Sequence, residues 1–187
     1  NKFIPKLFEL LNYLLDYRNK YKLKGKIMTD QLATLTQDGD VSIITLNDGK
    51  ANVFSTAMSN TINSLLDEVP DDKGSILITG KEGLFSAGFD LKTISGGDPK
   101  AAVEMTTAGF KLLSRIYSFP RPVIAAASGH AIALGAFLLC CADYRIGAKG
   151  KFIVQANETR NGMSIPTPIL EISKSLAKFS AVSPIPI

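Results

Sequence analysis

The stretch Phe85-Ser86-Ala87-Gly88-Phe89-Asp90-Leu91 follows a short apolar segment, and Ser128-Gly129-His130-Ala131-Ile132-Ala133-Leu134-Gly135-Ala136 follows another. Small side chains let a ligand approach the backbone, and the second stretch runs into a predicted helix start, where N–H groups carry partial positive charge. Two converging N–H donors form an oxyanion hole, which stabilises negative charge on a carbonyl oxygen. Alone, each stretch is weak support for such a site, because small residues between a strand and a helix more often serve close packing.

The hydrophobic pattern around these stretches predicts an α/β domain. Strands are expected at Ala33–Gln37, Val41–Leu46, Ser75–Thr79, Pro122–Ser128, Asp143–Ala148 and Phe152–Val154, and helices after Ser55, after Asp98 and at Pro166–Lys178. Asp38-Gly39-Asp40 predicts a hairpin between the first two strands, and Gly80–Gly88 is expected to be a loop. The helix after Asp98 is expected to bury Val103, Phe110, Leu113 and Tyr117. Strand pairs that alternate with helices favour a layered coil of ββα units over a doubly wound sheet.

Charge divides the 187 residues unevenly. The net charge is +4, but residues 1–27 carry +5 and the other 160 residues carry −1, so the main domain shows no basic signature of nucleic-acid binding. No apolar run reaches the roughly 18 residues of a membrane-spanning helix. We therefore expect a leader at 1–27, a core at 28–179 and an irregular tail at 180–187. We favour Met28 as the natural start, with a membrane-surface or partner helix at 1–27 as the alternative.

Together, the segments at 83–91 and 120–129 resemble the enoyl-CoA hydratase/isomerase (crotonase) family. The segment Ala133-Leu134-Gly135-Ala136 and the following Cys141-Ala142-Asp143-Tyr144-Arg145 share this resemblance, which runs from about Leu35 to about Leu176. It implies the crotonase-like (ClpP/crotonase) α/β fold, a spiral of ββα units with surrounding helices. It also implies an acyl-CoA substrate, no separate cofactor because coenzyme A is part of the substrate, and a homotrimer or hexamer if the chain is complete.

The resemblance also assigns site residues. The backbone N–H groups of Phe89 and Leu134 would form the oxyanion hole, and Glu158 would be the catalytic acid/base. Residues expected to contact coenzyme A or the acyl group are Lys50, Ala51, Val53, Ser86, Ala87, Gly88, Asp90, Leu91, Gly135 and Phe137.

Two departures from the family pattern bear on the reaction. Family hydratases carry a glutamate at the helix start where this chain has Phe137, and a second glutamate at the position of Glu158. Hydration is easiest with two carboxylates, whereas moving a double bond from Δ3 to Δ2 needs one base, so isomerase chemistry is favoured over hydratase chemistry. The alternative for Glu158 is an exposed loop glutamate. The other departure concerns length: by comparison with the family, we expect the usual C-terminal helices to be missing.

The cysteine, histidine and other aspartate residues give weaker indications of function. Cys140 and Cys141 are adjacent and are expected to fill the core rather than pair, which favours a cytoplasmic location. His130 is the one histidine, with no acidic residues of metal-ligand type around it, and we expect a packed residue and no metal site. Asp143 is expected to be structural, and Asp90 to hold its loop by accepting backbone hydrogen bonds. Two further alternatives stay open: an inactive crotonase-like protein that binds acyl-CoA, and an incomplete gene product.

Overall fold

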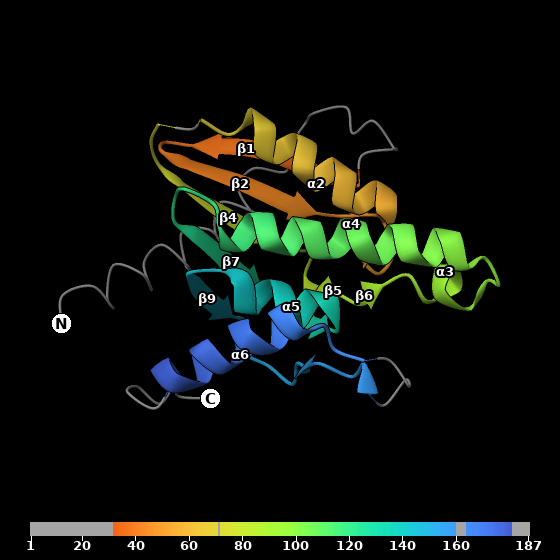
Figure 1. The fold of residues 1–187 in the computed structure, drawn as a ribbon. Helices are drawn as coiled ribbons and strands as arrows, with labels where there is room; N and C mark the ends of the chain where they lie inside the picture. Colours follow the sequence, from red (N-terminus) through yellow and green to blue (C-terminus); the bar gives the residue numbers. More distant parts are fainter. Residues whose placement is uncertain (1–31, 71, 160–163, 181–187) are drawn as a thin grey trace.

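A computed structural model describes residues 32–70, 72–159 and 164–180. The predicted leader at 1–27 and residues 181–187 of the predicted tail lie outside the described residues. The described chain folds into one five-stranded sheet, two smaller sheets and five helices (Figure 1).

The five-stranded sheet has the order β1-β2-β4-β7-β9. Its strands are β1 (Ala33–Asp38), β2 (Val41–Leu46), β4 (Ser75–Thr79), β7 (Val123–Ala127) and β9 (Tyr144–Gly147). The first two strands pair antiparallel and the others pair parallel. The predicted hairpin around Asp38-Gly39-Asp40 is confirmed, and Gly39 turns the chain with a φ of 55°, a backbone conformation that glycine adopts without strain.

The two smaller sheets hold the strands that lead to the candidate site. One pairs β3 (Val53–Phe54) with β6 (Gly88–Phe89), and the other has the order β10-β8-β5, with β10 at Val154–Gln155, β8 at Gly129–Ile132 and β5 at Gly83–Ser86. The prediction of a loop over Gly80–Gly88 was therefore wrong in part. These strands are only two to four residues long and pair with segments far along the chain, so local sequence periodicity could not reveal them.

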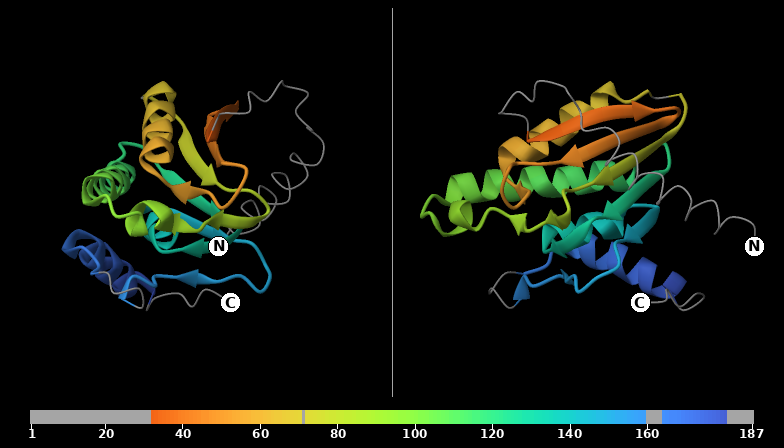
Figure 2. Two further views of the ribbon diagram at one scale, coloured as in Figure 1. Left: turned by 90° about the vertical axis from the view of Figure 1, so that its right-hand side faces the viewer. Right: turned by 180° about the vertical axis from the view of Figure 1, so that it is seen from behind.

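The ββα spiral is confirmed by the order in which the elements recur. A strand of the five-stranded sheet is followed by at least one short strand of a smaller sheet and then by a helix, four times in succession. The helices that close the four turns are α2 (Thr56–Glu68), α4 (Pro99–Tyr117), α5 (Leu134–Cys141) and α6 (Thr167–Ser180), with a short α3 (Leu91–Ser95) before α4. Figures 1 and 2 show α2 and α4 side by side over one face of the sheet.

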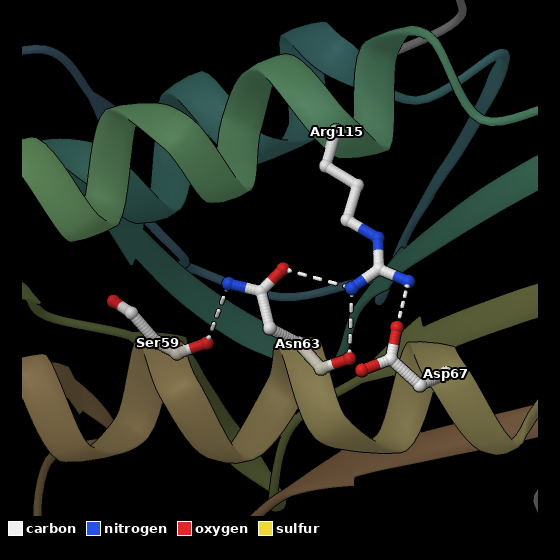
Figure 3. Close-up of polar contacts among 4 residues, drawn as sticks. All are labelled: Ser59, Asn63, Asp67 and Arg115. Carbon is white, nitrogen blue, oxygen red and sulfur yellow. Dashed lines mark hydrogen bonds and ion pairs between the residues drawn. The ribbon is translucent and has the colours of Figure 1, made fainter.

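The two long helices begin as the sequence predicts. The Ser55 side chain accepts a hydrogen bond from the Met58 N–H, and Asp98 accepts from the Lys100 and Ala101 N–H groups. At the other end of the pair, the Arg115 guanidinium of α4 donates to the backbone and side-chain oxygens of Asn63 and pairs with Asp67, both on α2 (Figure 3).

The face that α4 buries differs from the predicted one. Val103 and Tyr117 are 64% and 56% exposed, which contradicts their expected place in the core. The buried residues of α4 are Met105, Gly109, Leu112, Leu113 and Ile116. Phe110 is only partly buried, and Leu113 was predicted correctly. The buried stripe includes Gly109, which has no apolar side chain and so gave no hydrophobic signal.

Candidate active site

The two small-residue stretches meet where β6 passes the start of α5. Gly88 has a φ of +86°, and a Cβ placed on it would lie 2.6 Å from the Ala133 Cβ and 3.3 Å from the Leu134 backbone nitrogen. Only glycine allows the two segments to approach this closely. The close approach brings Phe89, the residue after Gly88, beside Leu134.

The side chains of Phe89 and Leu134 converge on one point of α4. A Cβ added to Gly109 would lie 2.6 Å from Phe89 Cε1 and 2.9 Å from Leu134 Cδ2. Both side chains are buried, and the Phe89 ring also packs edge-on against Phe110 with ring centroids 5.6 Å apart. One helix thus holds both residues whose N–H groups are the candidate oxyanion donors.

The first turn of α5 offers backbone donors. Ala133, at the N-cap position, has φ 51° and ψ −121°, an unusual conformation for a residue other than glycine, and its side chain makes no capping hydrogen bond. The first N–H groups of any α-helix lack carbonyl partners within the helix and form its partly positive end. Gly135 lies where a Cβ would come within 2.9 Å of the Ser86 Cβ, so its small size serves the packing of α5 on β5.

Glu158 follows the strand that lies against this helix start. Val154 of β10 pairs with Ala131 of β8, and the Ala133 N–H donates to the Gln155 carbonyl oxygen over 2.8 Å. The chain therefore leaves β10 beside the N-cap residue of α5, three residues before Glu158. The side chain of Glu158 is 5% exposed, so the alternative of an exposed loop glutamate is wrong.

The carboxyl group of Glu158 is buried without compensation from another residue. Neither of its oxygens has a hydrogen-bond partner among the other described residues. Loss of hydration raises the pKa of Glu158 above its ordinary value, and its own backbone N–H offsets part of that rise. A raised pKa makes the carboxylate a stronger base, and the protonated group can then return the proton as the acid.

The residues predicted to contact the ligand lie at different depths. Lys50 is exposed on the loop before β3, whereas Ala51 and Val53 are half-buried and join that loop to β6: the Ala87 N–H donates to the Ala51 oxygen, and Val53 pairs with Gly88. Phe137 is 4% exposed, in the interior rather than at the surface.

The residues after β6 begin α3. Asp90 accepts from the Lys92 backbone N–H, as predicted, and also from the Thr93 hydroxyl, but the segment that it caps is a short helix rather than the predicted loop. Leu91, a predicted ligand contact, lies in the first turn of this helix. It is 61% exposed, so its apolar side chain faces solvent.

One buried pair was not recognised from the sequence as a structural unit. Asn52 and Ser86 are both fully buried, and they link the loop before β3 to β5 and β6 through side-chain hydrogen bonds. Ser86 was predicted only as a ligand contact. The spacing of Asp48 and Asn52 was the available signal, because such side chains often hydrogen-bond to backbone groups of a nearby turn.

The remaining candidates are structural in the described chain. His130 Nδ1 accepts a hydrogen bond from the Ile153 N–H, and the ring packs edge-on against Phe152. Asp143 accepts from the Val123 N–H. Burial, with a smaller contribution from Cys140, raises the pKa of Cys141 to about 12, so this thiol stays protonated and is a poor nucleophile.

The described residues hold neither a metal site nor a membrane-spanning helix. They contain no group of three or more His, Cys, Asp or Glu placed to hold a metal ion. Within the same ranges, the helices are too short or too polar to cross a bilayer.

Comparison with known proteins agrees with the geometry. Residues 36–174 match the family described as enoyl-CoA hydratase/isomerase. The chain belongs to this family.

Individual relatives carry both activities in their names. The chain is 34% identical over 120 residues to a probable enoyl-CoA hydratase of Bacillus subtilis, covering 62% of this chain and 46% of that protein. It is 32% identical over 143 residues to the peroxisomal enoyl-CoA delta isomerase 2 of Arabidopsis thaliana, covering 72% and 60%. A crystal structure of a probable enoyl-CoA hydratase from Mycobacterium tuberculosis superposes with a TM-score of 0.72 and 42% identity, covering 76% of this chain and 61% of that one. The crotonase fold is therefore established, and this family member spans about half to three fifths of the length of its relatives.

Proposed function

We propose that this crotonase-family protein isomerises acyl-CoA thioesters from the Δ3- to the Δ2-enoyl form, with Glu158 as the single acid/base. The observation that carries the proposal is the environment of Glu158: a buried carboxyl with no hydrogen-bond partner among the other described residues, on the segment that leaves β10 beside the start of α5. Buried polar groups are almost always hydrogen-bonded, so a buried carboxyl without a partner among the other described residues is a candidate for function rather than stability.

The proposed reaction moves one proton and no other atom. The ionised Glu158 removes a proton from C2 of the 3-enoyl thioester, and the electron pair of that C–H bond delocalises onto the thioester oxygen to give a dienolate. The Phe89 and Leu134 N–H groups donate hydrogen bonds to this oxygen. Glu158 then returns the proton to C4, and the double bond comes to lie between C2 and C3. A raised pKa of Glu158 narrows the difference from the much higher pKa of the C2–H bond, which favours the proton transfer.

The absence of a second carboxylate at position 137 supports isomerisation over hydration. Hydration needs one group to orient water and another to manage the proton, and the buried Phe137 ring can do neither. The coenzyme A end of the substrate is assigned to the loop at 50–53 and to residues 86–88, where β3 and β6 pair. Assembly into a homotrimer or hexamer, and a cytoplasmic location, are further proposals that follow from the family resemblance and the cysteine content.

The decisive experiment compares Glu158→Gln with Glu104→Gln. The amide keeps the shape of Glu158 but cannot act as a base, so isomerisation of a 3-enoyl-CoA should fall about 10²–10⁴-fold, while calorimetric affinity for acetoacetyl-CoA stays within about threefold. Glu104 is an exposed glutamate of α4 and serves as the control. Full activity of Glu158→Gln would place the base elsewhere. Efficient hydration of crotonyl-CoA by the parent chain would overturn the isomerase preference.

A second candidate function is acyl-CoA binding without turnover. The apolar, buried Phe137 at a family acid position favours it. In that case acetoacetyl-CoA binds more tightly than free acetoacetate, but neither crotonyl-CoA nor a 3-enoyl-CoA is converted. Equal or absent binding of acetoacetyl-CoA and acetoacetate would contradict both functions.

A further inference from the structure

The loop between β2 and β3 is folded around one carboxylate. Asp48 accepts hydrogen bonds from the backbone N–H groups of Lys50 at 2.7 Å, Asn52 at 2.8 Å and Val53 at 3.1 Å. Asn52 has a φ of 50°, a conformation that costs other side chains more than it costs asparagine. The segment proposed to meet coenzyme A is therefore held in one conformation by its own residues.

The Asn52 side chain connects this loop to the interior of the protein through hydrogen bonds. It is fully buried, its oxygen accepts from the Asp48 N–H, and its nitrogen donates to the carbonyl oxygens of Leu46 and Phe85, each over 3.1 Å. Both amide hydrogens and the amide oxygen thus have partners. A buried polar network with every donor satisfied rigidifies its surroundings, whereas the loss of one member leaves others unpaired at a cost.

Ser86 continues the same network to the candidate oxyanion donor. Its hydroxyl donates to the Asn52 carbonyl oxygen at 2.7 Å and accepts from the Gly88 N–H at 3.0 Å. Gly88 directly precedes Phe89, and it is the residue that makes the close approach to Ala133 and Leu134. Ser86 therefore fixes the chain one residue before the proposed N–H donor.

We propose that Asn52 and Ser86 are positioning residues that hold the Phe89 N–H toward the thioester oxygen and couple it to the loop at 48–53. This inference rests on the proposed function, because it assigns a task to the Phe89 N–H. An oxyanion hole works by orienting its donors before the reaction, so small misplacements cost rate more than affinity. The Ser86 and Asn52 side chains contribute no group to the reaction itself; they set the direction of one that does.

The test compares Ser86→Ala with Ser42→Ala in the full chain. Ser42 is an equally buried serine on β2 whose hydroxyl donates to the Gln37 side chain, away from the Gly88 backbone. We expect Ser86→Ala to lower kcat for a 3-enoyl-CoA about 10- to 100-fold, to change KM less than about threefold, and to speed hydrogen exchange of the Gly88 amide. Ser42→Ala should show a comparable loss of thermal stability with kcat and Gly88 exchange unchanged.

A further variant and a second readout separate the outcomes. Ser86→Cys keeps a weak donor and acceptor of similar size, so it should recover part of the lost kcat, and it carries the test if Ser86→Ala does not fold. If kcat and Gly88 exchange in both Ser86 variants match those of Ser42→Ala, the inference is overturned and the proposed function stands. If the parent chain neither converts enoyl-CoA nor binds acetoacetyl-CoA, the proposed function fails. Amide exchange still shows, independently, whether Ser86 holds Gly88.

Discussion

Glu158 brings an ionisable group into the interior at a thermodynamic cost. Its 5% exposed side chain loses hydration, and no other described residue returns that loss through a hydrogen bond. An amide or an apolar side chain at position 158 would avoid the cost of burying a carboxylate. Such costs are typical of positions where activity and stability conflict.

This cost predicts how stability depends on pH. Because burial raises the folded-state pKa of Glu158 above the unfolded value, the folded state binds more protons, and stability falls as pH rises from about 4.3 through the raised pKa. Glu158→Gln removes that titration. Thermal melting should show the variant more stable than the parent at pH 8, with the difference shrinking toward pH 4. A gap that is constant with pH would mean that Glu158 titrates normally in the folded protein.

Phe137 allows a test of whether a second carboxylate would permit hydration. Phe137→Glu places a carboxylate where two-glutamate relatives have one, so hydration of crotonyl-CoA should appear or increase. Because the side chain is 4% exposed, an unpaired charge there should also lower the melting temperature. Phe137→Leu is the control: it removes the ring without adding a charge, and its hydration activity should match that of the parent. If Phe137→Glu folds but does not hydrate, the missing acid is not what limits that reaction.

The side chains of both candidate donor residues, Phe89 and Leu134, pack against helix α4. Gly109 has no side chain at the point where the Phe89 ring and the Leu134 side chain touch the helix. In an exposed helix position, Gly→Ala stabilises by about 1 kcal/mol. Here the added methyl must displace two buried side chains that belong to the donor residues.

We therefore expect Gly109→Ala to destabilise the protein and to lower kcat, against the helix-propensity trend. Thr107→Ala, at an exposed position of the same helix, should leave both quantities close to those of the parent. Chemical denaturation and steady-state kinetics would measure the two effects. A Gly109→Ala variant with higher stability and unchanged kcat would show that neither donor residue depends on α4 for its position.

The same helix shows what sequence alone could and could not predict. Its start at Asp98 follows from local capping chemistry, and the structure confirms it. Its buried face was predicted wrongly, because two adjacent apolar stripes compete on one helix and only the tertiary neighbours decide between them. The stripe that contains Gly109 is buried since Phe89 and Leu134 fill the space left by the missing side chain.

At the candidate site, too, local features could be predicted from the sequence, whereas long-range contacts could not. The strand pairs around the hairpin at Asp38-Gly39-Asp40 are local and could be predicted. The pairing of β3 with β6, and the hydrogen bonds from Asn52 and Ser86, join residues more than thirty positions apart. The family resemblance supplied the positions of Phe89, Leu134 and Glu158, but the burial of Glu158 and the network behind Phe89 became visible only in three dimensions.

At the scale of the whole molecule, the described chain closes its core with α6. Ile169 of this helix is 4% exposed and belongs to the same hydrophobic cluster as Leu138 and Leu139 of α5. Figure 1 shows α6 running along α5, on the side away from α2. The helix that follows the Glu158 segment thus packs behind the helix whose first turn offers the backbone donors, so the stability of this end of the molecule bears on the site.

Residues 1–27 and helix α6 are expected to differ in their contribution to stability. Residues 1–27 carry a net charge of +5, unlike the rest, and their apolar pattern changes at Met28. We expect a chain that begins at Met28 to melt within a degree or two of the parent and to bind acetoacetyl-CoA equally well. Ile169→Ala is the comparison: removing buried apolar atoms from α6 costs about 2–5 kcal/mol, so its melting temperature should fall by about 5 °C or more. A similar fall on removing residues 1–27 would mean that this segment packs on the domain, and a partner-helix role for it would then replace the leader interpretation.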